Sequence, residues 1–308
     1  MKEWRWALSG WLVVAGGVLL PLSVAVSEPL AGSVQQVSTQ QVSTKQIQQK
    51  AETHHALRMA AASSVAATAE QCQAIQPFYW EIGDAHARLA SGTEGGTAPT
   101  ATTPMRLASA TKWLFGAYVV EKRDGHLQPD DVKALTMRSG HTGLKYGLCV
   151  KRNDARQAQL TVRECFEASR PLRGSNAAHD PQHEGAFYYN GGHFQWWAVQ
   201  NGLGDLNNAT LAQELRRLLG DDLFLQFSSP QLAGGGYGTA DAYGQFLRRV
   251  LSGQLKIGAH LGESAVCTQP DACPQQALDT PLPQPLRWHY SLGHWVEDDP
   301  DNGDGSFS

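Results

Sequence analysis

The chain has 308 residues, of which 42% are hydrophobic, and a formal net charge of −4. This length is sufficient for one large domain or two small ones. The mild acidity, together with the lack of any run of lysine or arginine, argues against a nucleic-acid partner.

The N-terminus has the pattern of a secretory signal peptide. Lys2 and Arg5 precede an apolar stretch over residues 6–26, and Ala25-Val-Ser27 supplies small residues at the spacing of a cleavage site. The stretch is about 20 residues long, so an uncleaved membrane anchor is the alternative. We therefore expect residues 1–27 to direct export to the periplasm or the cell exterior, with a membrane as partner only if this segment is retained.

Residues 28–70 have the composition of a low-complexity linker. The stretch Gln35-Gln-Val-Ser-Thr39 is repeated as Gln40-Gln-Val-Ser-Thr44, and glutamine and alanine dominate the residues after the repeat. Such a composition predicts a tether, disordered or loosely helical, that buries no core. The globular part is then expected to begin near Gln71 and to occupy residues 71–308, with a first strand over Phe78–Gly83.

Five cysteines lie in the part that would be exported, where disulfides persist: Cys72, Cys149, Cys165, Cys267 and Cys273. Four paired cysteines allow three connectivities, and the fifth stays free or pairs elsewhere. We favour the local pairs Cys149–Cys165 and Cys267–Cys273, because each pair flanks a turn-rich loop. The spacing does not suit a zinc site, and no metal or other cofactor is expected.

Ser109-Ala-Thr-Lys112 is the most informative stretch of the sequence. A serine and a lysine three residues apart lie on one face of a helix. An ammonium beside the serine lowers the cost of forming an alkoxide, or, once desolvated, the amine takes the serine proton itself. A helix N-terminus adds N–H donors and positive potential. These are the parts of an acylating serine.

The same four residues also fit a helix-capping serine followed by a solvated lysine, because so short a motif often occurs by chance. The flanking sequence favours the acylating serine. Residues 113–120 are apolar on every side, which is typical of a helix buried inside a domain. We therefore expect a buried helix over Ser109–Glu121, in which Lys112 needs a partner.

Later elements have clearer boundaries. Thr210 is expected to cap a helix over Leu211–Leu219, with Gln213 completing a capping box and Gly220 ending the helix. Thr239 is expected to cap a second helix that runs to Leu251. A strand is expected over Trp288–Val296.

Several segments, taken in order, resemble the serine beta-lactamase and penicillin-binding group in its class C and esterase branch. After Ser109-x-x-Lys112, the similar segments are Ala134-Leu-Thr-Met-Arg-Ser-Gly140, Phe187-Tyr-Tyr-Asn-Gly-Gly192, Ala233-Gly-Gly-Gly-Tyr-Gly-Thr-Ala240 and Tyr290-Ser-Leu-Gly-His-Trp295. The resemblance spans residues 78–308. It implies an α+β fold of the beta-lactamase-like type, in which an antiparallel sheet carries a helical region and the active site lies between them.

The second motif of this family, Tyr-x-Asn, fits in two registers. Tyr188-Tyr-Asn190 matches the letters, whereas Tyr189-Asn-Gly191 matches the surrounding aromatic pattern better. We favour Tyr189, which could shuttle the serine proton to the leaving group. Asn190 and Gly191 are then expected to line the substrate, with Gly191 in place of the asparagine that would hold a substrate amide.

The third motif, Lys or His followed by Ser or Thr and Gly, is expected on a strand after Trp295. His141-Thr-Gly143 matches its letters but lies between the first two motifs, where we expect only a loop. We therefore expect the last strands and the C-terminal helix of the family's fold to be missing from this chain.

The resemblance implies an exported serine hydrolase that acts on a small-molecule or peptide ester or amide through an acyl-enzyme. Ser109 would be the nucleophile, and Lys112 and Tyr189 would manage its proton. Esterase or peptidase-like action ranks above beta-lactam hydrolysis because of Gly191. The alternative is a non-catalytic fragment or pseudoenzyme that keeps part of the fold.

Overall fold

The computed structural model of the chain describes residues 44–145, 149, 160–170, 174–299, 301, 303 and 305–308. The predicted signal peptide lies outside these residues. No helix in the described part is both long and apolar enough to cross a bilayer. The chain divides into two compact units, residues 1–99 and residues 100–308.

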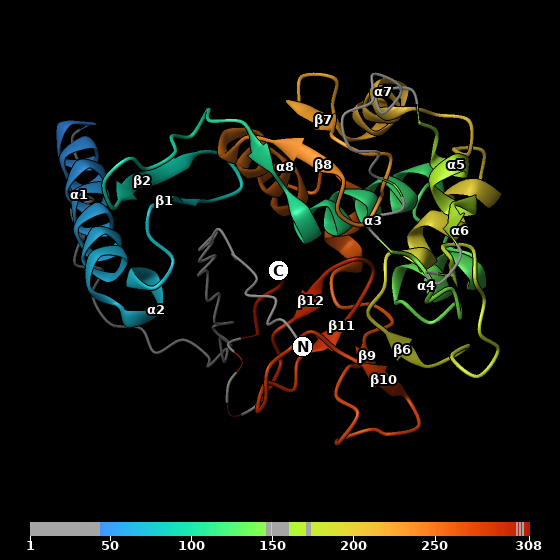
Figure 1. Ribbon diagram of the computed structural model, residues 1–308. Helices are drawn as coiled ribbons and strands as arrows, with labels where there is room; N and C mark the ends of the chain where they lie inside the picture. Colours follow the sequence, from blue (N-terminus) through green and yellow to red (C-terminus); the bar gives the residue numbers. More distant parts are fainter. Residues whose placement is uncertain are drawn as a thin grey trace, which may run out of the picture. The chain divides into compact units, whose positions relative to one another are not determined.

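The first unit combines a long helix with a β-hairpin. Helix α1 (Thr44–Thr68) is followed by the short α2 (Glu70–Gln73), and β1 (Phe78–Gly83) pairs antiparallel with β2 (Arg88–Glu94) (Figure 1). The strand predicted over Phe78–Gly83 is therefore confirmed.

The structure differs from the tether expected over residues 28–70. Met59, Ala62 and Ala66 recur on one face of α1, and this face packs against a core that contains Phe78 and Trp80 of β1. Small alanines allow the helix to approach the hairpin closely, although the mean hydropathy of the segment is low. The described end of the linker thus belongs to a packed unit, and the structure divides the chain after Pro99 rather than before Gln71.

The second unit mixes helices with small sheets. Its helices are η1 (Ala108–Ala110), α3 (Thr111–Lys122), α4 (Pro129–Leu135), α5 (Val162–Glu167), α6 (Gly192–Gln200), α7 (Asn208–Leu219), α8 (Ala240–Leu251) and η4 (Lys256–His260). Its strands are β3 (Met105–Arg106), β4 (Ser169–Arg170), β5 (Gly174–Ser175), β6 (Phe187–Tyr188), β7 (Leu225–Phe227), β8 (Gly236–Gly238), β9 (Val266–Cys267), β10 (Ala277–Asp279), β11 (His289–Tyr290) and β12 (Trp295–Val296).

These strands form the antiparallel sheets β3-β8-β7, β12-β11-β9 and β4-β5, and the parallel pair β10-β6. The α+β class predicted from the sequence is confirmed. The single antiparallel sheet that was expected is replaced, within the described residues, by these separate small sheets.

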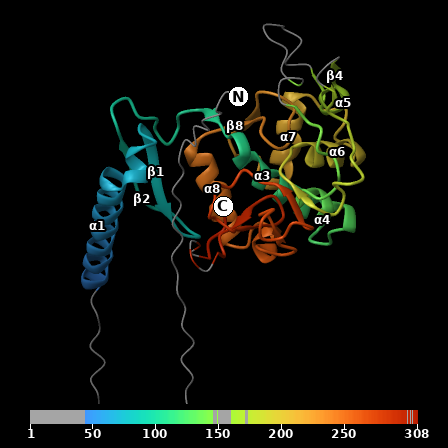
Figure 2. The same ribbon diagram turned by 60° about the horizontal axis from the view of Figure 1, so that its bottom comes forward.

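Helix α3 is the central element of the second unit. Every residue from Thr111 to Val120 is buried, as the apolar sequence predicts. In both views α4, α6 and α7 lie on one side of α3, and α8 and β8 lie on the other (Figure 1, Figure 2). The predicted helix begins with a single 3₁₀ turn, η1, which carries Ser109.

The strand predicted over Trp288–Val296 is broken into β11 and β12. The connection between them crosses α3 so closely that a Cβ on Gly116 would lie only 2.1 Å from the carbonyl oxygen of Leu292. Only glycine fits at this crossing, and the chain turns there because Ser291 N donates to His294 O. This contact between segments distant in the sequence is what a local strand pattern cannot show.

The N-terminal caps of α7 and α8 can be compared with those that the sequence predicts. Helix α7 begins one turn earlier than expected: Asn207 Oδ1 accepts from Ala209 N and Thr210 N, so Asn207 is the cap, and Thr210 closes the capping box in place of Gln213. Its end at Gly220 is as predicted. Thr239 caps α8, as expected, by accepting from Ala242 N.

Both predicted disulfides, Cys149–Cys165 and Cys267–Cys273, are present, and Cys72 is a buried free cysteine in the first unit. The first bridge fixes α5, which carries Cys165, to residue 149.

Peptide mapping without reduction is expected to recover the links Cys149–Cys165 and Cys267–Cys273 from the purified protein. Cys165→Ser should lower stability by about 3 kcal/mol, because a loop of this size loses its constraint in the unfolded state. A crosslink that joins Cys72 to any of the four would contradict this pairing.

A buried ion pair holds α4 against α3. Asp131 is fully buried and accepts from Arg123 Nε at 2.8 Å, from Arg123 Nη2 at 2.9 Å and from Trp197 Nε1 at 2.6 Å. Burial alone would raise the pKa of Asp131, but the hydrogen bonds from Arg123, Gln128 N and Trp197 outweigh it and lower that pKa. Three elements thus meet at one carboxylate.

Asp131→Ala is expected to destabilise the protein by about 3–5 kcal/mol at neutral pH, because it removes the buried carboxylate to which Arg123, Trp197 and Gln128 N donate. A depressed carboxyl pKa gives stability that is complete above the ordinary pKa and is lost as pH falls through the folded value. The difference between wild type and variant in urea unfolding should therefore shrink in acid. Asp130→Ala, at an exposed neighbour, is the control, and an equal effect of both changes would contradict this account.

Candidate active site

Ser109 and Lys112 are in direct contact at the start of α3. Lys112 Nζ donates to Ser109 Oγ at 2.9 Å. Lys112 is only 5% exposed, whereas Ser109 is half-buried and therefore open to a bound molecule. The spacing of the motif thus brings the two side chains onto one face, with the hydroxyl nearer to the solvent.

Two further groups hold the Lys112 ammonium. Nζ donates to the main-chain carbonyl of Ala233 at 2.6 Å, and it lies 4.7 Å from the centre of the Tyr189 ring. A cation over an aromatic face is stabilised by the ring quadrupole. The lysine therefore has the partners that its burial requires.

The structure separates the two tyrosines of the second motif. Tyr189 faces Lys112 and stacks on Trp295 with ring centres 5.6 Å apart, whereas Tyr188 stacks on His183. Burial, followed by the nearby Asp279 carboxylate, raises the pKa of Tyr188. Tyr189 is thus the tyrosine that lies beside Lys112.

His193 fixes the backbone that carries these tyrosines. Its Nδ1 accepts from Ser139 N at 3.1 Å, so the ring proton is on Nε2, which donates to Tyr188 O at 3.0 Å. His193 is fully buried, and burial lowers its pKa to about 3, so the ring is neutral at physiological pH. This neutral tautomer ties the Ser139–Gly140 loop to β6.

The side chain of Asn190 forms hydrogen bonds with main-chain groups of the protein. Its Oδ1 accepts from Gly192 N at 2.8 Å and from Leu144 N at 3.2 Å, and its Nδ2 donates to Leu144 O. The side chain thus binds the loop after His141 to the start of α6. The amide of Asn190 is thus engaged with the main chain, and its expected contact with a substrate stays a prediction.

Gly191 lies at the start of α6, where the side chains of Ala233 and Leu144 pack against the helix. A Cβ at this position would lie 2.9 Å from Ala233 Cβ and 2.9 Å from Leu144 Cδ2. There is no room for an asparagine side chain here. A side chain longer than that of glycine at this position would require Ala233 or Leu144 to shift.

The backbone before the candidate nucleophile is strained. Ala108 has φ 46°, in the left-handed region that costs an L-residue about 1–2 kcal/mol. Leu107 N donates to Gly236 O and Tyr243 Oη to Ala110 O at 3.3 Å, so neighbouring elements hold the turn on both sides of Ser109. Strain of this kind concentrates at functional sites.

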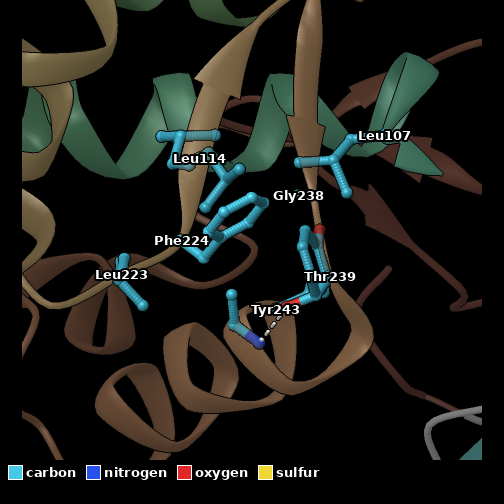
Figure 3. A pocket seen from close by; sticks show the side chains of 9 residues that line it. Leu107, Leu114, Leu223, Phe224, Gly238, Thr239 and Tyr243 are labelled. Carbon is cyan, nitrogen blue, oxygen red and sulfur yellow. Dashed lines mark hydrogen bonds between the residues drawn. The ribbon is translucent and has the colours of Figure 1, made fainter. Parts of the chain in front are cut away.

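A small apolar pocket, partly open to solvent, lies between β7, β8 and α8 (Figure 3). It is lined by Leu107, Leu114, Leu223, Phe224, Leu225, Gly238, Thr239, Ala242 and Tyr243. Burial raises the pKa of Tyr243. The lining contains neither Ser109 nor Lys112, so this pocket is separate from the candidate nucleophile.

The remaining sequence candidates lie elsewhere. His141-Thr-Gly143 is in a loop, as expected, with the His141 ring stacked on Trp196. Among the residues that the structure describes, no group of histidine, cysteine or acidic side chains could hold a metal ion. The carbonyl of Ala233 is a site group that the sequence did not point to, although it lies in the glycine-rich segment over residues 233–240.

No family model matches this sequence, and no curated protein is similar to it in sequence. The structure is similar to a candidate beta-lactamase from Bacteroides dorei DSM 17855, with 19% identity, a TM-score of 0.44 and coverage of 71% of this chain and 74% of the other. It is also similar to a beta-lactamase from Mycobacterium bovis, with 16% identity, a TM-score of 0.43 and coverage of 70% and 69%.

Tyr189→Phe is expected to slow covalent labelling of the protein by a fluorescent phosphonate about a hundredfold, because the hydroxyl that would carry a proton is removed. Tyr188→Phe is the matched control and should label at the wild-type rate. Rates measured by gel fluorescence that fall for Tyr188→Phe and not for Tyr189→Phe would reverse the assignment.

Proposed function

We propose that this protein is an exported serine hydrolase that cleaves an ester or amide through an acyl-enzyme. The hydrogen bond of 2.9 Å from the buried Lys112 ammonium to the more exposed Ser109 hydroxyl supports the proposal most directly. A serine in contact with a lysine that the interior holds in place is an activated nucleophile. The two disulfides are in keeping with export.

In the proposed reaction, Ser109 Oγ attacks the substrate carbonyl carbon while the positive charge of Lys112 stabilises the developing charge on Oγ. Tyr189, beside the ammonium, relays the proton: its hydroxyl gives its own proton to the leaving group as it accepts the proton of Ser109. The N–H at Ser109 lies in the first turn of the helix, where amides lack an intrahelical partner, and is the candidate donor to the oxyanion. Water then releases the acyl group.

The packing around Gly191 favours simple esters or peptide-like amides over beta-lactams as substrates. Leu144 and Ala233 fill the space that an amide-holding asparagine would need, and Asn190 is bound to the main chain of Leu144. The chain thus lacks a side-chain amide at this place to recognise the acylamino group of a beta-lactam. The rival proposal, a non-catalytic protein that keeps part of the fold, makes the opposite prediction for turnover.

Ser109→Ala is expected to abolish hydrolysis of an activated ester by the full chain, because no other described serine is bonded to a buried lysine. Ser252→Ala, in the exposed turn after α8, is the control and should hydrolyse at the wild-type rate. The ester should also be cleaved faster than a chromogenic cephalosporin. Hydrolysis that survives Ser109→Ala, or no hydrolysis by the wild type, would argue for the non-catalytic alternative.

A further inference from the structure

Gln195 is a fully buried polar side chain on α6, and it lies close to the candidate site without being part of it. Its Nε2 donates to Pro230 O at 2.7 Å and to Val162 O at 3.0 Å, and its Oε1 accepts from Leu232 N at 3.4 Å. One amide thus satisfies three main-chain groups on two other segments. Buried hydrogen bonds of this kind are costly to remove, because their partners are left unpaired.

Gln195 holds the segment over residues 230–236, which carries the main-chain carbonyl that accepts from Lys112. Leu232 directly precedes Ala233, whose oxygen accepts from Lys112 Nζ at 2.6 Å. Gly236, at the other end of the segment, is fixed to the start of α3: its N–H donates to Thr111 Oγ1 at 3.2 Å and its oxygen accepts from Leu107 N at 2.9 Å. The Ala233 carbonyl is therefore flanked by the Gln195 bond to Leu232 on one side and by the Gly236 bonds on the other, and Gly235 N closes the turn locally by donating to Gln231 O at 2.8 Å.

Gln195 also shares its helix with the second motif. Its own N–H donates to Gly191 O in the first turn of α6, two residues after Tyr189. The same side chain is bonded to Val162 at the start of α5, the helix that carries the disulfide-bonded Cys165. One amide side chain thus links α6, which follows Tyr189, to α5 and to the segment that carries the Ala233 carbonyl.

We infer that Gln195 is a positioning residue, which keeps the Ala233 carbonyl on Lys112 and so fixes the ammonium between Ser109 and Tyr189. This role rests on the proposed function only for its effect on catalysis. A displacement of about 1 Å in a catalytic group costs up to about a hundredfold in rate. Without Gln195, the carbonyl moves away from Lys112 and the lysine loses its best acceptor.

The test uses Gln195→Met, which keeps the volume of the side chain without its hydrogen bonds, and Gln195→Glu, whose carboxylate has no N–H for the two carbonyls. Leu219→Ala is the control. It creates a cavity at a buried position of α7 and so lowers the stability of the protein without removing any bond to the Ala233 segment. Labelling of the full chain by a fluorescent phosphonate is measured as a function of pH, at a temperature where circular dichroism shows each variant folded.

Both Gln195 variants should label about ten- to a hundredfold more slowly than the wild type. The dependence of their labelling rate on pH should also differ from that of the wild type, because the acceptor of the Lys112 N–H is displaced. Leu219→Ala should keep the wild-type profile. Wild-type rate and pH profile in a folded Gln195→Met or Gln195→Glu protein would overturn the inference.

A crystal structure of Gln195→Met gives a result that does not depend on activity. The distance from Lys112 Nζ to Ala233 O should lengthen beyond about 3.5 Å, the limit of a hydrogen bond. An unchanged contact would overturn the inference even if Ser109 is reactive. A lengthened contact in a protein whose Ser109 never labels would support the positioning role of Gln195 and contradict the proposed function alone.

Discussion

Lys112 carries a charge that is only 5% exposed, and a charge so far from water must find its partners within the protein. The Ala233 carbonyl, the Ser109 hydroxyl and the Tyr189 ring supply them. These groups come from three segments that are distant in the sequence, so the requirement of one ammonium draws the three together. The helices and strands of the second unit hold these segments in place.

The close approach of backbones makes this arrangement possible. Gly116 lets the connection between β11 and β12 cross α3, and this brings Trp295 near enough to stack on Tyr189. Gly191 lets Ala233 and Leu144 pack against the start of α6. The same packing leaves no space for an amide side chain, so the feature that holds the site together also limits the substrates that it could take.

The sequence predicts those features that depend on local chemistry. The apolar run after Lys112 predicts the buried helix, Gly220 predicts the end of α7, and the two turn-rich loops predict the disulfides. The features that it could not show depend on contacts between distant segments: the break between β11 and β12 at Gly116, the packing of α1 on the hairpin through Met59 and small alanines, and the three main-chain partners of Gln195. Asn190 shows most clearly what the sequence cannot predict. An asparagine side chain suits substrate binding as well as it suits the main-chain hydrogen bonds that Asn190 makes.

In the proposed reaction Ser109 is the nucleophile because Lys112 holds a charge beside it. Peptide mass spectrometry of the full chain after reaction with a fluorophosphonate tests this claim directly, since the reagent forms a stable bond only with an activated hydroxyl. We predict one adduct per chain, on the peptide that contains Ser109, and none in Lys112→Ala. An adduct on another residue, or no adduct on folded wild-type protein, would contradict the claim.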